Sequence, residues 1–371
     1  MAVLKGLAVL FRLAWLAALR LVKILILKPS SLGDVVQALP VLRLIKRHLP
    51  QSEIHWWLDS RLAPLLEGDP DLASVVLFER QRWASLRHWP EMGRSIRWLR
   101  QQAFDWVIDL QCLLRSGVFA WLANGRLTIG LDEPREGARG FYDIIVRRRS
   151  ALTHAADWYL DVLPPLGVPV DRDFQWIPER PALAESVRRK WPVGHAQWIA
   201  IQPGARWPNK RWPAESYAEL VRLLAAANPE LQFAILGGAE DRSLGEAIAR
   251  VNTKRCLDLT GRISLPEMVE WIRLSRLMVT NDTGPMHIAA ALAKPVVALF
   301  GPTEPRRTGP YGQLDHIVRV NLPCAPCMKS RCTQPNSMEC LRAISPASVL
   351  AAVQKRLGSA TFPACHSADC A

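Results

Sequence analysis

The chain has 371 residues, of which 49% are hydrophobic and 22% charged, which is enough for two globular domains and excludes a disordered or fibrous protein. A formal net charge of +13 predicts a polyanionic partner, and charge alone leaves nucleic acid, an anionic membrane face and a phosphorylated substrate open. Eight cysteines in a chain of this length are not typical of a small secreted disulfide framework.

Residues 1–22 are apolar apart from cations at Lys5, Arg12 and Arg20. Their longest uncharged run is shorter than the ~20 residues that a membrane-spanning helix needs. No small-residue cleavage site precedes residue 23, which weakens the interpretation as a signal peptide. We expect an amphipathic helix on an anionic lipid surface, with a solvated extension as the alternative, and therefore a cytoplasmic protein that touches a membrane.

The first half of the chain alternates apolar strands with helical periodicity, which predicts an α/β domain over residues 23–175. A proline-rich passage over residues 164–181 then interrupts the alternation, as an interdomain connection does. The expected strands are 23–27, 53–58, 74–78 and 106–110, and the expected helices are 34–48 and 89–102.

The alternation restarts in the second half and predicts another α/β domain over residues 176–345, followed by a carboxy-terminal helix and tail over 346–371. Two doubly wound domains in sequence imply a central ligand cleft at the carboxyl ends of their strands. The expected strands are 198–202, 231–236, one near 257, 277–279 and 295–300, and the expected helices are 214–227, 240–251, 265–274, 285–293 and 346–357.

The loop over residues 28–34 follows the first strand, where a dinucleotide fold would carry GxGxxG and a phosphate-binding NTPase GxxxxGK[ST]. It has neither pattern and instead presents Ser30, Ser31, one glycine and Asp34 at the start of a helix. A carboxylate at the cleft can accept a proton from a substrate hydroxyl during attack. The alternative is that Asp34 only caps the helix.

Two loops of the second domain are candidates for binding a nucleotide. Residues 202–213, QPGARWPNKRWP, combine three cations with two indoles, which favours contact with a diphosphate and a flat ring over a solvated loop. Glu240 and Asp241 end the next strand, where they can hold ribose hydroxyls or simply start a helix.

The segment 280–287, TNDTGPMH, joins an apolar strand directly to a helix. Asp282 or Thr283 can cap this helix, Gly284 allows close approach of a ligand, and Pro285 suits the first helical position. Free amides at a helix start favour a phosphate, so we predict an anion site here, with an ordinary capped helix as the alternative.

Residues 80–100 form a basic stretch with interleaved tryptophans, in which Arg94 and Arg97 are candidates for binding an anionic acceptor. A nucleic-acid surface and a solvated helix face are the alternatives. Farther on, Cys324, Cys327, Cys332 and Cys340 are enough for tetrahedral zinc, but their spacing is not that of a paired CxxC ribbon, which favours reduced thiols that pack a loop.

Six motifs follow one another in the chain: KILILKPSSLGDVVQALPVL, QPGARWPNKRWP, ILGGAEDR, LTGRISLPE, VTNDTGPMHIAAAL and VALFGPTEP. In this order they resemble family nine glycosyltransferases, the ADP-heptose:lipopolysaccharide heptosyltransferases. The resemblance in order and spacing extends over residues 23–357. The resemblance implies the two-domain GT-B fold, an ADP-sugar in the second domain, a lipid A core acceptor in the first, and inversion at the anomeric carbon without a required metal or cofactor.

The resemblance also implies a role for individual residues. Asp34 matches the proposed general base and Lys210 the lysine that holds the diphosphate. Arg206 stands where some members have a hydroxyl residue, and the ribose carboxylate is assigned to Glu240 with a possible slip to Asp241. The remaining donor residues are Ile263 over the adenine and Asp282, Thr283, Gly284 and His287 in the phosphate loop, and the acceptor residues are Ser31, Arg94 and Arg97.

The implied donor is ADP-L-glycero-D-manno-heptose, and the implied acceptor is Kdo-lipid A or heptosyl-Kdo-lipid A, not nucleic acid. The implied location is the cytoplasmic side of the inner membrane, where the protein would be peripheral. Two alternatives stay open: a nucleotide-sugar-binding family member with another donor sugar, and one without transferase activity. The missing GxGxxG disfavours a Rossmann dehydrogenase.

Overall fold

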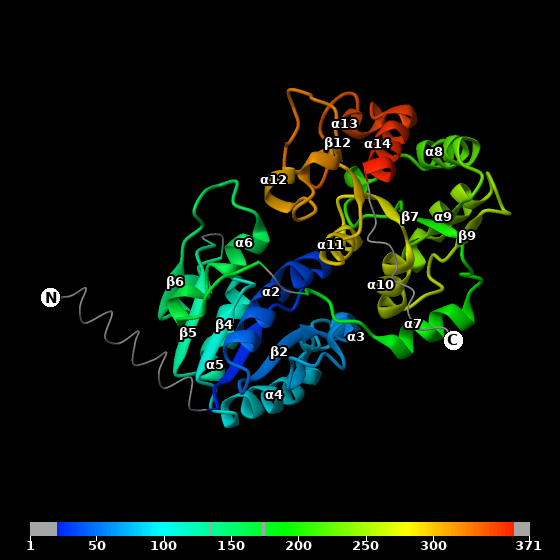
Figure 1. Ribbon diagram of the computed structural model, residues 1–371. Coiled ribbons are helices and arrows are strands. Elements are labelled where there is room, and N and C mark those ends of the chain that lie inside the picture. Colours follow the sequence, from blue (N-terminus) through cyan, green and yellow to red (C-terminus); the bar gives the residue numbers. More distant parts are fainter. Residues whose placement is uncertain (1–20, 134–135, 173–174, 360–371) are drawn as a thin grey trace. The chain divides into compact units, whose positions relative to one another are not determined.

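The computed structural model describes residues 21–133, 136–172 and 175–359. It divides into two units, Met1–Arg180 and Pro181–Ala371, each with a six-stranded parallel sheet (Figure 1). Almost all of the expected amphipathic helix over residues 1–22 and the tail after residue 359 lie outside the described residues. The two parallel sheets with their helices confirm the predicted α/β class.

The sheet of the first unit has the strand order β3-β2-β1-β4-β5-β6, and every neighbouring pair is parallel. The direction of winding therefore reverses between β1 and β4, as in a doubly wound fold. Helices cover both faces, so the central strands are continuous apolar runs. The strands are β1 Lys23–Leu27, β2 Glu53–Asp59, β3 Ser74–Phe78, β4 Trp106–Asp109, β5 Leu127–Leu131 and β6 Ile144–Val146.

The α-helices of the first unit include α2, which begins at Leu32, two residues before the expected start. Asp34 is therefore the third residue of the helix. The α-helices are α2 Leu32–His48, α3 Ala63–Leu66, α4 Trp89–Gln101, α5 Leu114–Ala123 and α6 Ala155–Leu160, and the 3₁₀ turns are η1 Ser60–Leu62, η2 Arg82–Ala84, η3 Leu86–His88, η4 Ala138–Phe141 and η5 Pro164–Leu166.

The sheet of the second unit has the order β12-β11-β10-β7-β8-β9, again entirely parallel. Counted from its own first strand, this order is the same as in the first unit, and the winding reverses between β7 and β10. The strands are β7 Gln197–Gln202, β8 Leu231–Ile235, β9 Cys256–Asp258, β10 Leu277–Asn281, β11 Val296–Leu299 and β12 Ile317–Val318.

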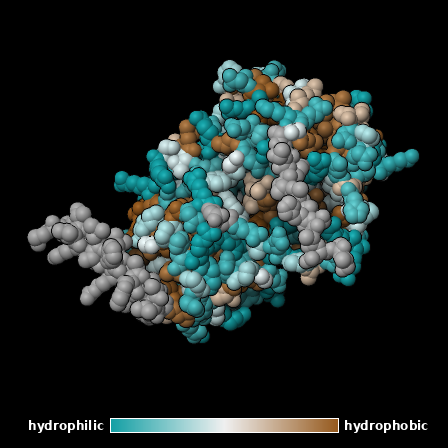
Figure 2. All heavy atoms as spheres, in the orientation of Figure 1, coloured by the Kyte–Doolittle hydropathy of each residue, from teal (hydrophilic) through white to brown (hydrophobic). Residues whose placement is uncertain are grey.

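The last helix, α14, belongs to the core of the second unit, because its Val349 and Val353 are fully buried against the sheet and α8. Hydrophilic residues cover most of the face shown in Figure 2, with smaller hydrophobic areas between them. The helices are α7 Pro181–Lys190, α8 Ala214–Ala227, α9 Arg242–Ala249, α10 Leu265–Leu274, α11 Gly284–Ala291, α12 Pro305–Thr308, α13 Glu339–Arg342 and α14 Pro346–Ser359, and the 3₁₀ turns are η6 Pro208–Lys210, η7 Ala239–Asp241 and η8 Leu314–His316.

The junction between β10 and α11 differs from the expected one. The strand continues to Asn281, so two polar residues of the expected turn complete the buried ladder with β11. The helix begins at Gly284, which makes Pro285 its second residue. The turn is therefore short: only Asp282 and Thr283 separate strand from helix.

The first unit continues to Arg180, beyond the residue 175 at which we expected the domain to end. Two arginines hold this segment. Arg180 donates to the carbonyls of Pro64 and Leu65 at 3.0 and 2.7 Å, and Arg43 donates to the carbonyl of Trp176 at 3.1 Å. The end of the proline-rich passage is therefore attached to α2 and α3 of the first unit.

Candidate active site

In the first unit, the loops that follow β1 and β4 meet where the winding reverses. The buried ammonium of Lys28 donates to the carbonyl oxygen of Leu110 at 2.9 Å. The indole N–H of Trp56 donates to the carbonyl oxygen of Lys28 at 3.2 Å. Ligands of doubly wound sheets bind at such a reversal, outside the carboxyl ends of the strands.

Asp34 is half-buried in the first turn of α2 and accepts hydrogen bonds on both carboxylate oxygens. Its Oδ2 accepts from the backbone N–H of Ser31 at 3.0 Å and from the Ser31 hydroxyl at 2.6 Å. Its Oδ1 accepts from the phenol of Tyr159 at 3.3 Å. Asp34 thus caps the start of α2, as the alternative interpretation expected. The same hydrogen bonds hold the carboxylate in one orientation, which is compatible with a chemical role as well.

Ser31 is exposed and touches Asp34, but the two arginines that we expected to bind the acceptor lie on a different helix. Arg94 and Arg97 are exposed on α4, which packs through Met92 and Ile96 onto the cluster formed by β1, β2, β4 and α5. Neither arginine forms an ion pair within the part of the chain that the structure describes. Their charge is therefore available to a ligand on that surface.

In the second unit, Asn281 joins the loops that follow β7 and β10. Its Oδ1 accepts from the backbone N–H of Trp212 at 3.0 Å, and its Nδ2 donates to the carbonyl of Pro203 at 2.7 Å. Both ends of the segment QPGARWPNKRWP are thereby attached to the end of β10. This places the segment at the point where the second sheet reverses its winding.

Lys210 and Asp282 form the centre of this arrangement. The Lys210 Nζ lies 2.6 Å from the Asp282 Oδ2 and 4.7 Å from the centre of the Trp207 ring. The hydroxyl of Thr303, in the loop after β11, donates to the same Oδ2 at 2.5 Å. Three strand-end loops thus place one cation, one hydroxyl and one carboxylate together.

The start of α11 is open to an anion. Thr283 occupies the cap position, but no side chain accepts a hydrogen bond there, contrary to the expectation that Asp282 or Thr283 caps the helix. The Asp282 carboxylate is held instead by Lys210 and Thr303. Gly284 is half-buried and His287 buried within the same helix. A helix start without a capping side chain is a favourable position for phosphate oxygens.

The two neighbouring carboxylates after β8 differ in burial. Glu240 is exposed, whereas Asp241 is buried and accepts from the backbone N–H of Gly238 at 3.2 Å. A Cβ added to Gly204 would lie only 2.2 Å from Asp241 Oδ2, so this carboxylate packs directly on the loop after β7. Burial raises the pKa of Asp241. Asp241 thus packs on the loop after β7, and Glu240 faces solvent beside it.

Ile263 and Arg206 are both accessible at the same end of the sheet. Ile263 is half-exposed in the turn between β9 and α10, two residues after Gly261. Gly261 has a φ of 63°, and a Cβ there would lie 2.7 Å from the Ala239 backbone. Arg206 is exposed and, among the described residues, forms no ion pair. An apolar side chain and a cation are therefore offered to a ligand from different loops.

Sequence reasoning missed three residues of these clusters. Thr303 lies in the quoted motif VALFGPTEP, and its hydroxyl directly after a buried strand was the available signal. Asn281 lies in the segment that follows the expected strand 277–279, and an amide side chain at the end of an apolar strand was the available signal for a contact between loops. Tyr159 carried no local signal, because it lies 125 residues from its partner Asp34.

The four cysteines of the expected loop line one small pocket of about 40 Å³, together with Asn209 and Pro302. The Asn209 side chain donates to the carbonyl of Lys329 at 2.8 Å, which attaches this loop to the residue before Lys210. Over residues 21–133, 136–172 and 175–359, no three His, Cys, Asp or Glu side chains are placed to hold a metal ion.

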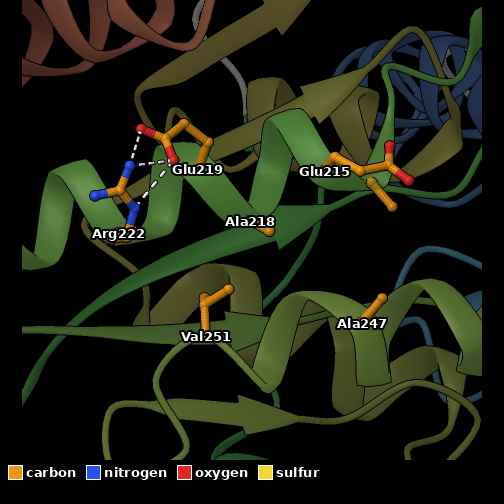
Figure 3. A pocket seen from close by; sticks show the side chains of 7 residues that line it. Glu215, Ala218, Glu219, Arg222, Ala247 and Val251 are labelled. Atoms are coloured by element: carbon orange, nitrogen blue, oxygen red, sulfur yellow. Dashed lines mark hydrogen bonds and ion pairs between the residues drawn. The ribbon is translucent and has the colours of Figure 1, made fainter.

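A larger surface hollow of about 290 Å³ lies between α8 and α9 (Figure 3). It is lined by Ala218, Ala247 and Val251, with the ion pair of Glu219 and Arg222 at one side. None of the candidate residues lines it, so it is separate from the strand-end clusters.

In the described part of the chain, no helix has the length and hydrophobicity needed to cross a bilayer.

Known proteins resemble this chain over most of its length. The model of glycosyltransferase family 9 (heptosyltransferase) matches residues 92–338. Lipopolysaccharide heptosyltransferase 1 of Pseudomonas aeruginosa is 30% identical over 334 residues, which cover 84% of this chain and 87% of the relative.

Two solved structures share the fold. The Escherichia coli ADP-heptose LPS heptosyltransferase II has a TM-score of 0.73 and 24% identity, covering 90% of this chain and 98% of that one. The E. coli heptosyltransferase WaaC with ADP-2-deoxy-2-fluoro heptose has a TM-score of 0.69 and 23% identity, covering 90% and 99%. The chain therefore has the GT-B fold of these enzymes. Because the family model spans more than half of the chain and a relative at 30% identity covers most of it, the protein belongs to glycosyltransferase family 9, the heptosyltransferases.

Proposed function

We propose that this protein transfers heptose from ADP-L-glycero-D-manno-heptose to the lipopolysaccharide inner core, with inversion at the anomeric carbon. The observation that carries the proposal is the position of its candidate residues. The principal ones lie where the winding of each sheet reverses: Asp34 in the first turn of α2, after the loop that follows β1, and Lys210 with Asp282 in the loops after β7 and β10. This is where doubly wound sheets bind their ligands.

The second unit is suited to the donor. When the glycosidic bond to the diphosphate breaks, negative charge develops on the leaving ADP. The Lys210 ammonium and the uncapped amides of α11 are fixed groups that stabilise such charge. The solved E. coli relative with an ADP-heptose analogue supports an ADP-sugar as the donor. Arg206, Ile263, Thr283, Gly284 and His287 complete the proposed donor contacts, with Glu240 or its neighbour Asp241 on the ribose.

The first unit is suited to activating the acceptor. Asp34 accepts the proton of the acceptor hydroxyl while that oxygen attacks the anomeric carbon and the bond to ADP breaks. The products are the glycosylated acceptor and ADP, and no metal or further cofactor takes part in the proposed reaction. Ser31 orients the carboxylate, and the exposed Arg94 and Arg97 contact the anionic acceptor.

The acceptor is Kdo-lipid A or heptosyl-Kdo-lipid A in this proposal, because relatives named heptosyltransferase 1 and heptosyltransferase II both match the chain. Such a lipid acceptor lies in the membrane, so we place the protein at the cytoplasmic face of the inner membrane as a peripheral protein. Its net charge of +13 favours that anionic surface.

The proposal is tested by measuring ADP release with ADP-heptose and acceptors truncated at successive core positions. Parallel reactions use ADP-glucose and UDP-glucose as donors, and one set contains EDTA. We expect ADP release only with ADP-heptose and one acceptor, unchanged by EDTA. Release with another donor sugar would support the alternative family function, and no release with any pair would support binding without transfer.

A further inference from the structure

Tyr159 and Asp34 come from different parts of the first unit and meet through their polar atoms. Tyr159 lies on α6 and is 5% exposed, and its phenol donates to Asp34 Oδ1 at 3.3 Å. Ser31 donates twice to the other carboxylate oxygen. The carboxylate cannot turn about its Cβ–Cγ bond without breaking a contact on one side.

The surroundings of Tyr159 hold its ring in place. The buried His154 caps the start of α6 by accepting from the backbone N–H of Ala156 at 3.2 Å, and the helix packs against α2. The Lys28 ammonium lies 4.7 Å from the centre of the Tyr159 ring, a favourable distance for a cation over an aromatic face. The same Lys28 ammonium donates a hydrogen bond to the carbonyl oxygen of Leu110. The phenol is thus positioned by both loops of the reversal point.

The phenol also acts as a donor over the whole physiological range. Burial, and then the negative charge of Asp34, raise the pKa of Tyr159, so its hydroxyl keeps its proton. A hydrogen bond donated to a carboxylate stabilises the ionised form over the protonated one. The expected consequence is an Asp34 that stays ionised at lower pH than it would without the phenol.

We propose that Tyr159 is a positioning residue for heptosyl transfer, which fixes the orientation of the Asp34 carboxylate and keeps it ionised. The inference rests on the proposed function, in which Asp34 is the base. Tyr159 acts through Asp34 and does not touch the substrate. Tyr159 would thereby give α6 a role in the reaction, although this helix carries none of the quoted sequence motifs.

The test compares Tyr159→Phe with the matched control Tyr142→Phe by the pH dependence of kcat. Tyr142 also donates a half-buried phenol to a buried carboxylate, Asp109, at 2.7 Å in the same unit. A hydrogen bond to a charged group corresponds to about one pKa unit. Activity is lost as pH falls through the pKa of the base, so Tyr159→Phe is expected to move this acid limb about one unit higher. At a pH below the acid limb, kcat of Tyr159→Phe should therefore be about ten-fold lower than that of the wild-type protein. Tyr142→Phe should leave the acid limb at the wild-type pH.

An unchanged acid limb and kcat in folded Tyr159→Phe would overturn the inference. The variant Asp34→Asn distinguishes failure of this inference from failure of the proposed function. If Asp34→Asn keeps wild-type activity, the assignment of Asp34 as the base is wrong. In an Asp34→Asn background, Tyr159→Phe should change nothing further, and an additional loss would show that Tyr159 acts elsewhere. If Tyr159→Phe does not fold, 3-fluorotyrosine at position 159 is used instead, because it keeps the aromatic ring and the hydroxyl. Its more acidic hydroxyl donates a stronger hydrogen bond to Asp34, so the acid limb of kcat should move to lower pH. An acid limb that stays at the wild-type pH would contradict the inference.

Discussion

The ammonium of Lys210 lies 2.6 Å from the carboxylate of Asp282, although 72 residues separate them in the chain. The contact joins the loops after β7 and β10 at the reversal point of the second sheet. Asp282 is buried, and Thr303 donates to the same oxygen. The cation is therefore held in place before any ligand binds, which is the condition for effective stabilisation of a leaving diphosphate.

Replacing Lys210 by alanine is expected to lower kcat for ADP-heptose by about 10²-fold to 10³-fold, the usual effect of removing one charge-stabilising donor. Lys190→Ala is the matched control, because Lys190 forms an ion pair of similar length, 2.7 Å, with Glu267 on the surface of the same unit. Steady-state ADP release measures both. Equal activities of the two variants would refute the role given to Lys210.

Gly204→Ala is expected to destabilise the second unit by about 1–3 kcal/mol, because the new methyl group would lie 2.2 Å from Asp241 Oδ2. The buried carboxylate must then move from its place against the loop after β7. Gly93→Ala on α4 is the control, since no atom outside its chain neighbours and the helix backbone lies within 4 Å of its added Cβ. Chemical denaturation checks the difference, and equal midpoints would show that Asp241 is not fixed against Gly204.

Arg43→Met is expected to cost about 3–5 kcal/mol of stability, because it leaves a buried carboxylate without its cation. Arg43 binds Asp69 through both terminal nitrogens at 2.7 and 2.5 Å, and the Asp69 side chain is 1% exposed. Arg47→Met removes an exposed pair with Asp171 from the same helix and should cost less than about 1 kcal/mol. A loss of equal size in both variants, measured by urea unfolding, would contradict this account.

The cysteines should differ in the pH at which they react with iodoacetamide, since the thiolate is the nucleophile. Hydrogen bonds from the backbone amides of Met338 and Gln334 lower the pKa of Cys332. Burial and the neighbouring cysteines raise that of Cys340, and burial raises the pKa of Cys256 to about 11. Cys332 should therefore be alkylated at lower pH than Cys340 and Cys256. Mass spectrometry of digested protein gives the order, and a later reaction of Cys332 would be the contrary result.

Strong periodic signals allowed much of the fold to be predicted. The bounds of β1, α8 and α10 are as expected from their apolar patterns. The strand β5 was not expected, because Gly130 interrupts its apolar run; in the structure a Cβ there would overlap the Tyr142 ring at 2.3 Å. β6 and β12 have three and two residues, too few to show any alternation.

The candidate site was predictable where a residue follows a strand within a recognisable motif. Lys210 and Asp282 are of this kind, and the structure brings them together. The partner of Asp34 was not predictable, because Tyr159 lies on a helix of six residues whose position depends on packing against α2. Tertiary packing between distant segments, not local pattern, decides such contacts.

The mass of the acceptor after incubation with ADP-heptose tests the central claim most directly. Wild-type protein should add one heptose to Kdo-lipid A or to heptosyl-Kdo-lipid A, and Asp34→Asn should add it at least about 10²-fold more slowly, as expected for loss of a general base. No added heptose on either acceptor with the wild-type protein, while ADP-heptose stays intact, would contradict the proposed function.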